Sequence, residues 1–135
     1  GDAIMAVFGG VMPVESACDA ALAAALLMRA ALNELNAARA KAGLPAIHNG
    51  IGLHFGEVLQ GAIGSAERKD FTIIGDAVNT ASRIEGLCKD FKTDLVFSDS
   101  VYNAASPAVQ ARCRRIGEAQ VKGREQPIDL WTIDV

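Results

Sequence analysis

The 135-residue sequence has few cysteines, and their arrangement argues against two of their usual roles. Cys18, Cys88 and Cys113 are odd in number and show neither a CxxC motif nor another metal-type spacing. This pattern favours reduced, buried thiols over a disulfide framework or a cysteine metal site. Reduced thiols are typical of cytosolic proteins, so we expect a cytoplasmic domain.

The sequence also lacks an excess of positive charge. It has 13 lysines and arginines against 16 aspartates and glutamates, which gives a net charge of −3. Domains that bind nucleic acid are usually basic, so we expect no nucleic-acid partner. Any anionic ligand would have to be bound by a few locally placed cations.

No apolar stretch is long enough for a transmembrane helix. The longest one, residues 20–28, is rich in alanine, whereas a span needs about 20 apolar residues. The first residues also lack the basic segment and apolar core of a signal peptide. We therefore expect no membrane contact by this domain itself. Because the chain begins at Gly1 without a methionine, we interpret it as part of a longer protein, whose other segments could attach to a membrane.

Half of the residues are apolar, which predicts one compact domain over residues 1–135. Periodicity and turn residues predict strand 3–8, helix 15–42, strands 49–55, 57–63 and 68–74, helix 77–91, strand 94–98, a short helix before Pro107, and a terminal hairpin of 112–121 and 127–135. Strands 49–55 and 57–63 are expected to pair antiparallel, and Ser98 is expected to cap the short helix. Strands with helices on one face indicate an α+β two-layer sandwich.

The most informative segment, residues 68–83, passes from an extended run through Gly75 and Asp76 into a helix. Asn79 and Arg83 lie one helical turn apart on this helix, so their side chains point the same way. An amide and a guanidinium so placed can hold a sugar or phosphate oxygen and stabilise charge on a phosphoryl group. A solvated helix face is the alternative explanation of the pair. Asp76 is better explained as a helix cap than as a metal ligand.

Residues 68–83, RKDFTIIGDAVNTASR, resemble the signature of the class III nucleotidyl cyclases, which are adenylate and guanylate cyclases. The resemblance extends to GDAIMAVFG at 1–9, GIGLHFGEV at 50–58, GAIG at 61–64, VKGRE at 121–125 and Trp131. Each motif is weak alone, but their order and spacing are specific. The resemblance implies a ferredoxin-like βαββαβ core with a C-terminal hairpin, whose first strand and helix would precede Gly1.

The same resemblance implies an activity: conversion of ATP to 3′,5′-cyclic AMP and pyrophosphate, assisted by two divalent cations, Mg²⁺ or Mn²⁺. Family members share their active sites across a head-to-tail dimer, so we expect a homodimer. In this family Asn79 would position the ribose and Arg83 would stabilise the transition-state phosphate. Asp2 would be one of two metal-binding aspartates, although a turn or cap aspartate is its ordinary explanation.

Thr72 matches the position that selects the purine, where threonine or aspartate accompanies adenine. By itself it is only a residue that favours strands. Lys122 and Arg68 match residues that bind the triphosphate, with surface solvation as the alternative. His54 and Glu57 are interpreted as a packed histidine and a surface or capping carboxylate.

Two other functions remain open from the sequence: a guanylate cyclase, and a catalytically silent cyclase-like domain that serves as a dimerising regulatory module. We expect the segment to be inactive in isolation, because the first metal-binding strand would lie upstream of it.

Overall fold

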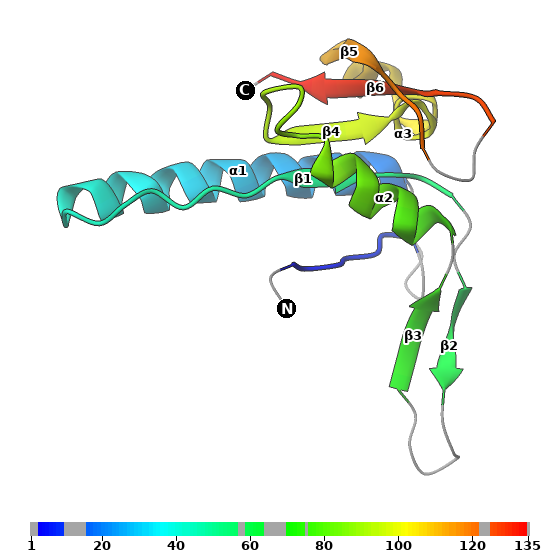
Figure 1. The fold of residues 1–135 in the computed structure, drawn as a ribbon, viewed down its shortest axis with the longest axis horizontal. Helices are drawn as coiled ribbons and strands as arrows, with labels where there is room; N and C mark the ends of the chain where they lie inside the picture. The colour runs from blue at the N-terminus through cyan, green and yellow to red at the C-terminus, as the bar shows by residue number, and fades with distance from the viewer. Residues whose placement is uncertain are drawn as a thin grey trace.

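A computed structural model describes residues 3–9, 16–56, 59–63, 70–74, 76–121 and 125–134, and in 59–63 and 70–74 it describes the main chain alone. The elements are α1 (Ala17–Lys41), β1 (Ile51–Leu53), β2 (Leu59–Ile63), β3 (Asp70–Ile74), α2 (Asp76–Gly86), β4 (Leu95–Ser98), α3 (Asp99–Ala104), α4 (Pro107–Gln110), β5 (Cys113–Ala119) and β6 (Ile128–Ile133) (Figure 1).

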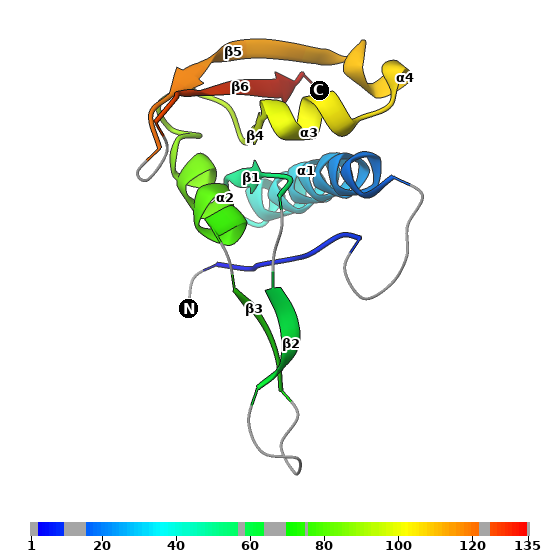
Figure 2. The same cartoon turned by 90° about the vertical axis from the view of Figure 1, so that its right-hand side faces the viewer.

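The described strands form two separate sheets. A four-stranded mixed sheet has the order β1-β4-β6-β5, in which β1 runs parallel to β4 and β6 pairs antiparallel with both β4 and β5. β2 and β3 pair antiparallel and project from the rest of the molecule as a two-stranded arm (Figure 1 and Figure 2). The predicted α+β class is confirmed, whereas these strands do not by themselves establish the βαββαβ order.

The long helix predicted at 15–42 is confirmed as α1. Ser16 caps its first turn by accepting a hydrogen bond from the Asp19 amide at 3.3 Å, and Gly43, at φ 75°, follows its last turn. The C-terminal half of α1 binds the segment that follows the helix. The Asn36 side-chain amide donates to the Ile47 carbonyl oxygen and accepts from the Ile47 amide, both at 2.8 Å. Arg39 donates a third hydrogen bond to the Pro45 carbonyl oxygen.

Two apolar clusters cover the two faces of β4. Leu95 and Phe97 pack with α1 and α3, whereas Val96, which points to the opposite face, packs with Ile84 and Cys88 of the α2 region. The prediction that the helices lie on one face is therefore wrong at β4. A fully buried central strand needs apolar cover on both sides, and α2 supplies the second layer.

The predicted pairing of strands 49–55 and 57–63 is also wrong. β1 pairs with β4, and β2 pairs with β3. Ile51 and Leu53 pack on the α1 cluster, while Gly52 contacts α2. A strand covered on both faces fits beside buried β4 better than in a hairpin with one solvated face.

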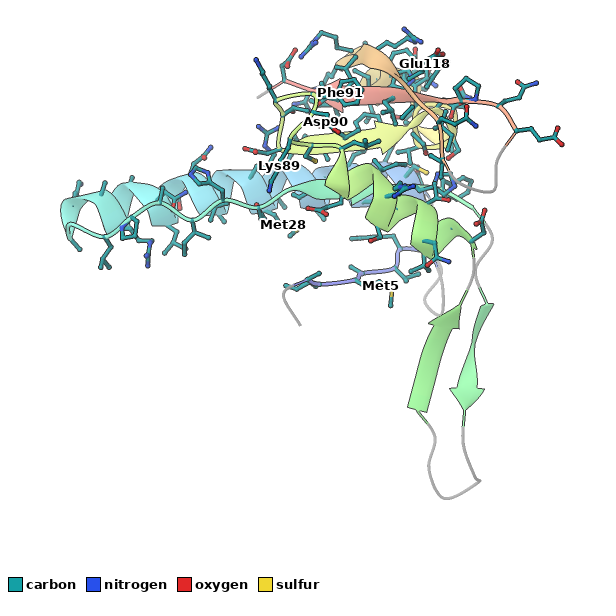
Figure 3. The ribbon with its side chains drawn as sticks, in the orientation of Figure 1. Met5, Met28, Lys89, Asp90, Phe91 and Glu118 are labelled. Carbon is teal, nitrogen blue, oxygen red and sulfur yellow. The ribbon has the colours of Figure 1, made fainter. Side chains whose placement is uncertain are left out.

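Residues 3–8 were predicted to form a buried strand, but they form none and are exposed. Ile4 is 91% and Met5 58% exposed. The Met5 side chain is labelled on this segment in Figure 3. Strand conformation requires a neighbour for the backbone N–H and C=O groups. None of the strands within the described ranges pairs with this segment.

The helix predicted at 77–91 ends at Gly86. Beyond this residue the Leu87 amide donates to the Ile84 carbonyl at 3.0 Å, which tightens the chain out of the α-helix. Phe91 then packs against β5, where a Cβ on Gly117 would lie 2.8 Å from its ring. The terminal hairpin, strand β4 and the short helix α3 are confirmed.

Ser98 occupies the N-cap position of α3, as predicted, but its side chain makes no capping hydrogen bond. The three cysteines are free thiols; Cys18 and Cys88 are buried and Cys113 is half-buried. Within the part of the chain that the structure describes, no helix is both long and apolar enough to cross a membrane.

Candidate active site

The helix α2 carries the two central residues of the predicted site. Its buried residues, Ala77, Thr80 and Ile84, recur at the spacing of one helix face. Asn79 and Arg83 lie between them in sequence and are exposed. Their spacing of one turn places the amide and the guanidinium on a common, solvent-accessible side of the helix.

Neither of these two side chains is used to hold the fold together. Among the described residues, no hydrogen bond or ion pair involves Asn79 or Arg83, whereas other exposed arginines, such as Arg114, are paired with carboxylates. The donors of Asn79 and Arg83 are therefore available to a ligand.

The position of α2 is set by close contact with β1. A Cβ on Gly52 would lie 2.6 Å from the Ala81 carbonyl oxygen and 2.4 Å from the Glu85 backbone nitrogen. A Cβ on Gly56 would lie 3.1 Å from Ala77 Cβ. Glycine at 52 and 56 therefore lets α2 lie directly on the chain that leads out of β1.

A buried polar group lies on the inner side of the same helix. Thr80 is 1% exposed, and its hydroxyl has no hydrogen-bond partner in the structure as far as it is described. An orphaned hydroxyl is uncommon in a core. On its inner face, α2 therefore buries the Thr80 hydroxyl among its neighbours without giving it a hydrogen bond.

The other predicted site residues are placed only in part. The backbone of Thr72 lies in the middle of β3, paired with Gly61 of β2. Asp2, Arg68 and Lys122 lie outside the described residues. The structure thus brings Asn79 and Arg83 together and does not test the remaining four assignments.

A metal site is not built by the described residues. Within their ranges, no three histidine, cysteine, aspartate or glutamate side chains converge. Asp76 is the first residue of α2, in the position where a carboxylate favours the helix dipole.

His54 is half-buried and packed against the fold, although it follows β1 instead of lying in the strand. Its Nδ1 lies 2.7 Å from the Ser98 hydroxyl. The sequence did not reveal this partner, nor the role of Gly52 beneath α2. The alternation of Gly50 and Gly52 with Ile51 and Leu53 was the available signal for the glycine contact.

Comparison with known proteins defines the class. Residues 1–134 match the adenylate and guanylate cyclase catalytic domain family. The chain belongs to this family.

Two curated relatives are bacterial adenylate cyclases. One, from Anabaena cylindrica, is 41% identical over 98% of this chain and 26% of its own length. The other, adenylate cyclase 1 of Rhizobium meliloti, is 32% identical over 98% of this chain and 20% of its length. The chain thus spans about a quarter of these proteins or less. Among solved structures, the guanylyl cyclase Cya2 is similar with a TM-score of 0.75 and 30% identity, over 93% of this chain and 62% of that one.

Proposed function

We propose that this chain is the catalytic domain of an adenylate cyclase that converts ATP to 3′,5′-cyclic AMP and pyrophosphate. The observation that carries the proposal is the exposed pair Asn79 and Arg83 on α2, at the positions of the family motif. Neither side chain has a hydrogen-bond or ion-pair partner among the residues that the structure describes. The identity of 41% to an adenylate cyclase supports the choice of product.

The two side chains have different tasks in this proposal. Asn79 binds and orients the ribose, so that its 3′ hydroxyl faces the α-phosphate. Arg83 donates to the phosphate oxygens on which charge develops, and its planar, permanently charged fork suits that task. Thr72 accepts a hydrogen bond from the adenine amino group. Arg68 and Lys122 bind the triphosphate.

Two divalent cations, Mg²⁺ or Mn²⁺, would supply Lewis-acid chemistry for attack and for departure of pyrophosphate. Asp2 is the residue of this chain that would bind them, and the described residues do not complete the site. The proposed assembly is a homodimer with shared sites, in which Asp2 of one protomer faces Asn79 and Arg83 of the other.

A guanylate cyclase is the second candidate, and the likeness to Cya2 favours it. Turnover of ATP and GTP by the purified full-length protein, with cyclic AMP and cyclic GMP quantified separately, distinguishes the two. We expect a preference for ATP; a preference for GTP would overturn the assignment of Thr72. If neither nucleotide is cyclised with Mg²⁺ or Mn²⁺, the domain is catalytically silent, and the alternative of a regulatory module is favoured.

Complementation tests the shared site. Asp2→Ala should abolish Mn²⁺-dependent activity without unfolding the protein, and Arg83→Ala should do so independently. Mixing the two inactive variants should restore one intact site per heterodimer and part of the activity. If heterodimers form and no activity returns, each protomer holds its own complete site.

A further inference from the structure

A hydrogen-bonded cluster links three elements beside α2. His54 follows β1, Ser98 ends β4 and Ser100 lies in the first turn of α3. His54 Nδ1 lies 2.7 Å from Ser98 Oγ, which in turn lies 2.9 Å from Ser100 Oγ. The Phe55 amide donates to Ser100 Oγ at 3.3 Å. The chain leaving β1 is therefore bound twice to the β4–α3 junction.

The bond to His54 takes the place of a helix cap. Ser98 stands at the N-cap of α3, where a serine hydroxyl normally accepts from an amide of the first turn, yet it makes no such bond. Its hydroxyl, in a fully buried residue, is turned to His54 and Ser100 instead. Local capping has thus given way to a contact between elements distant in sequence.

The ring of His54 reaches α2 through Gly56. A Cβ on Gly56 would lie 3.5 Å from His54 Nε2 and 3.1 Å from Ala77 Cβ. Gly56 is therefore bounded by the imidazole and by the first turn of α2. The Nδ1 nitrogen of the ring is bound to Ser98, and this bond holds the adjoining Gly56 segment, on which Ala77 lies.

We propose that His54 is a positioning residue for the first turn of α2, and that its bond to Ser98 holds Asn79 in place. The proposal rests on the proposed cyclase function, because Asn79 acts there on the ribose. α2 has two supports: Gly52 lies under Ala81 and Glu85, and the Gly56 segment lies under Ala77. Loss of His54 releases only the second support, so the first turn moves while the rest of the helix stays in place.

Four variants of the full-length protein test this role. His54→Ala should lower kcat by about tenfold or more, because small displacements of a positioning group are amplified in rate. Asparagine can place an amide near the position of Nδ1, whereas glutamine reaches toward that of Nε2. His54→Asn should therefore retain kcat to within about twofold, while His54→Gln and Ser98→Ala should resemble His54→Ala.

A matched control separates positioning from general loss of stability. Thr132 is buried, and its hydroxyl donates to the Leu95 carbonyl at 2.6 Å without a hydrogen bond to α2. Thr132→Val removes a comparable buried hydrogen bond and should leave kcat unchanged. If it lowers kcat as much as His54→Ala, the effect of His54 is only structural and the proposal is wrong.

A double-mutant comparison with Asn79 provides a second measurement of the role of His54. In an Asn79→Ala background, His54→Ala should lower kcat by less than about twofold, because groups that act as one unit are not additive. If the double variant instead loses kcat by the product of the two single-variant losses, the proposal is wrong.

Amide hydrogen exchange supplies a readout that needs no activity. Thr80 and Ala81 carry the first amides whose acceptors lie within the helix. Their exchange should rise at least about fivefold in His54→Ala, and not in His54→Asn or Thr132→Val. If the wild type makes no cyclic nucleotide, the proposed function fails, and the exchange still decides whether His54 supports α2. Unchanged exchange in His54→Ala rejects the positioning role.

Discussion

Gly52 of β1 lies against the backbone of Glu85 in α2, where a Cβ atom would come within 2.4 Å of the Glu85 nitrogen. The same atom would lie 2.6 Å from the Ala81 carbonyl oxygen. Backbone atoms cannot rotate away as the end of a side chain can. The absence of a side chain at Gly52 therefore fixes how closely α2, with Asn79 and Arg83, approaches the sheet.

Gly52→Ala should destabilise the protein by about 1–3 kcal/mol, the usual effect of overpacking a close contact. Gly86→Ala is the matched control, since nothing lies within 4 Å of a Cβ there. It should be neutral or stabilise by up to about 1 kcal/mol, because alanine restricts the unfolded chain. Urea denaturation of both variants measures the difference, and equal effects would show that α2 does not rest on Gly52.

Asn79→Ala and Arg83→Ala should each lower turnover by at least about tenfold, because a positioned transition-state donor is lost. Arg83→Lys should not restore activity, since an ammonium lacks the planar fork. Both residues are exposed and make no described internal bond, so urea stability should hardly change. Ser82→Ala, on an exposed residue between them, is the control. If Arg83→Ala keeps full turnover, Asn79 and Arg83 are residues of an ordinary solvated helix face and the catalytic assignment is wrong.

Ser16→Ala should reduce stability by roughly 0.5–2 kcal/mol, because the Asp19 amide loses its capping partner. Ser106 provides a comparison within the chain: it holds the N-cap position of α4 without a side-chain capping bond. Ser106→Ala should therefore have the smaller effect in parallel urea denaturation. The reverse order would contradict the cap on α1.

Burial raises the pKa of the Cys88 thiol to about 11. In the unfolded chain this thiol ionises at its ordinary, lower pKa, so the folded state binds more protons between the two values. The stability associated with the protonated thiol is thus present below the unfolded pKa and is lost as pH rises toward 11. The free energy of unfolding, measured from pH 8 to about 11, should fall less steeply in Cys88→Ala. Identical slopes would show that the thiol does not contribute.

The sequence by itself determined those helices and strands whose residue pattern lies entirely within the element. α1 follows from an alanine-rich run between Ser16 and Gly43, and the β5–β6 hairpin from two strand patterns joined by a polar turn. The common orientation of Asn79 and Arg83 could be predicted for the same reason, because residues one turn apart lie on the same side of a helix.

Partners distant in sequence were decided only by the tertiary structure. Residues 49–55 have the composition of a strand, but nothing local shows that β1 pairs with β4 rather than with its neighbour β2. Residues 3–8 likewise have the apolar character of a strand, but a strand forms only where another backbone accepts its hydrogen bonds.

The candidate site shows the same division. The sequence alone determined that this chain carries an amide and a guanidinium one helical turn apart, within the motifs of a cyclase. The tertiary structure decided that this helix lies directly on Gly52 and that the Ser98 hydroxyl binds His54 instead of capping α3. Those contacts join segments far apart in the chain, so their energy depends on the packing of the whole core and leaves no periodic signal in the sequence.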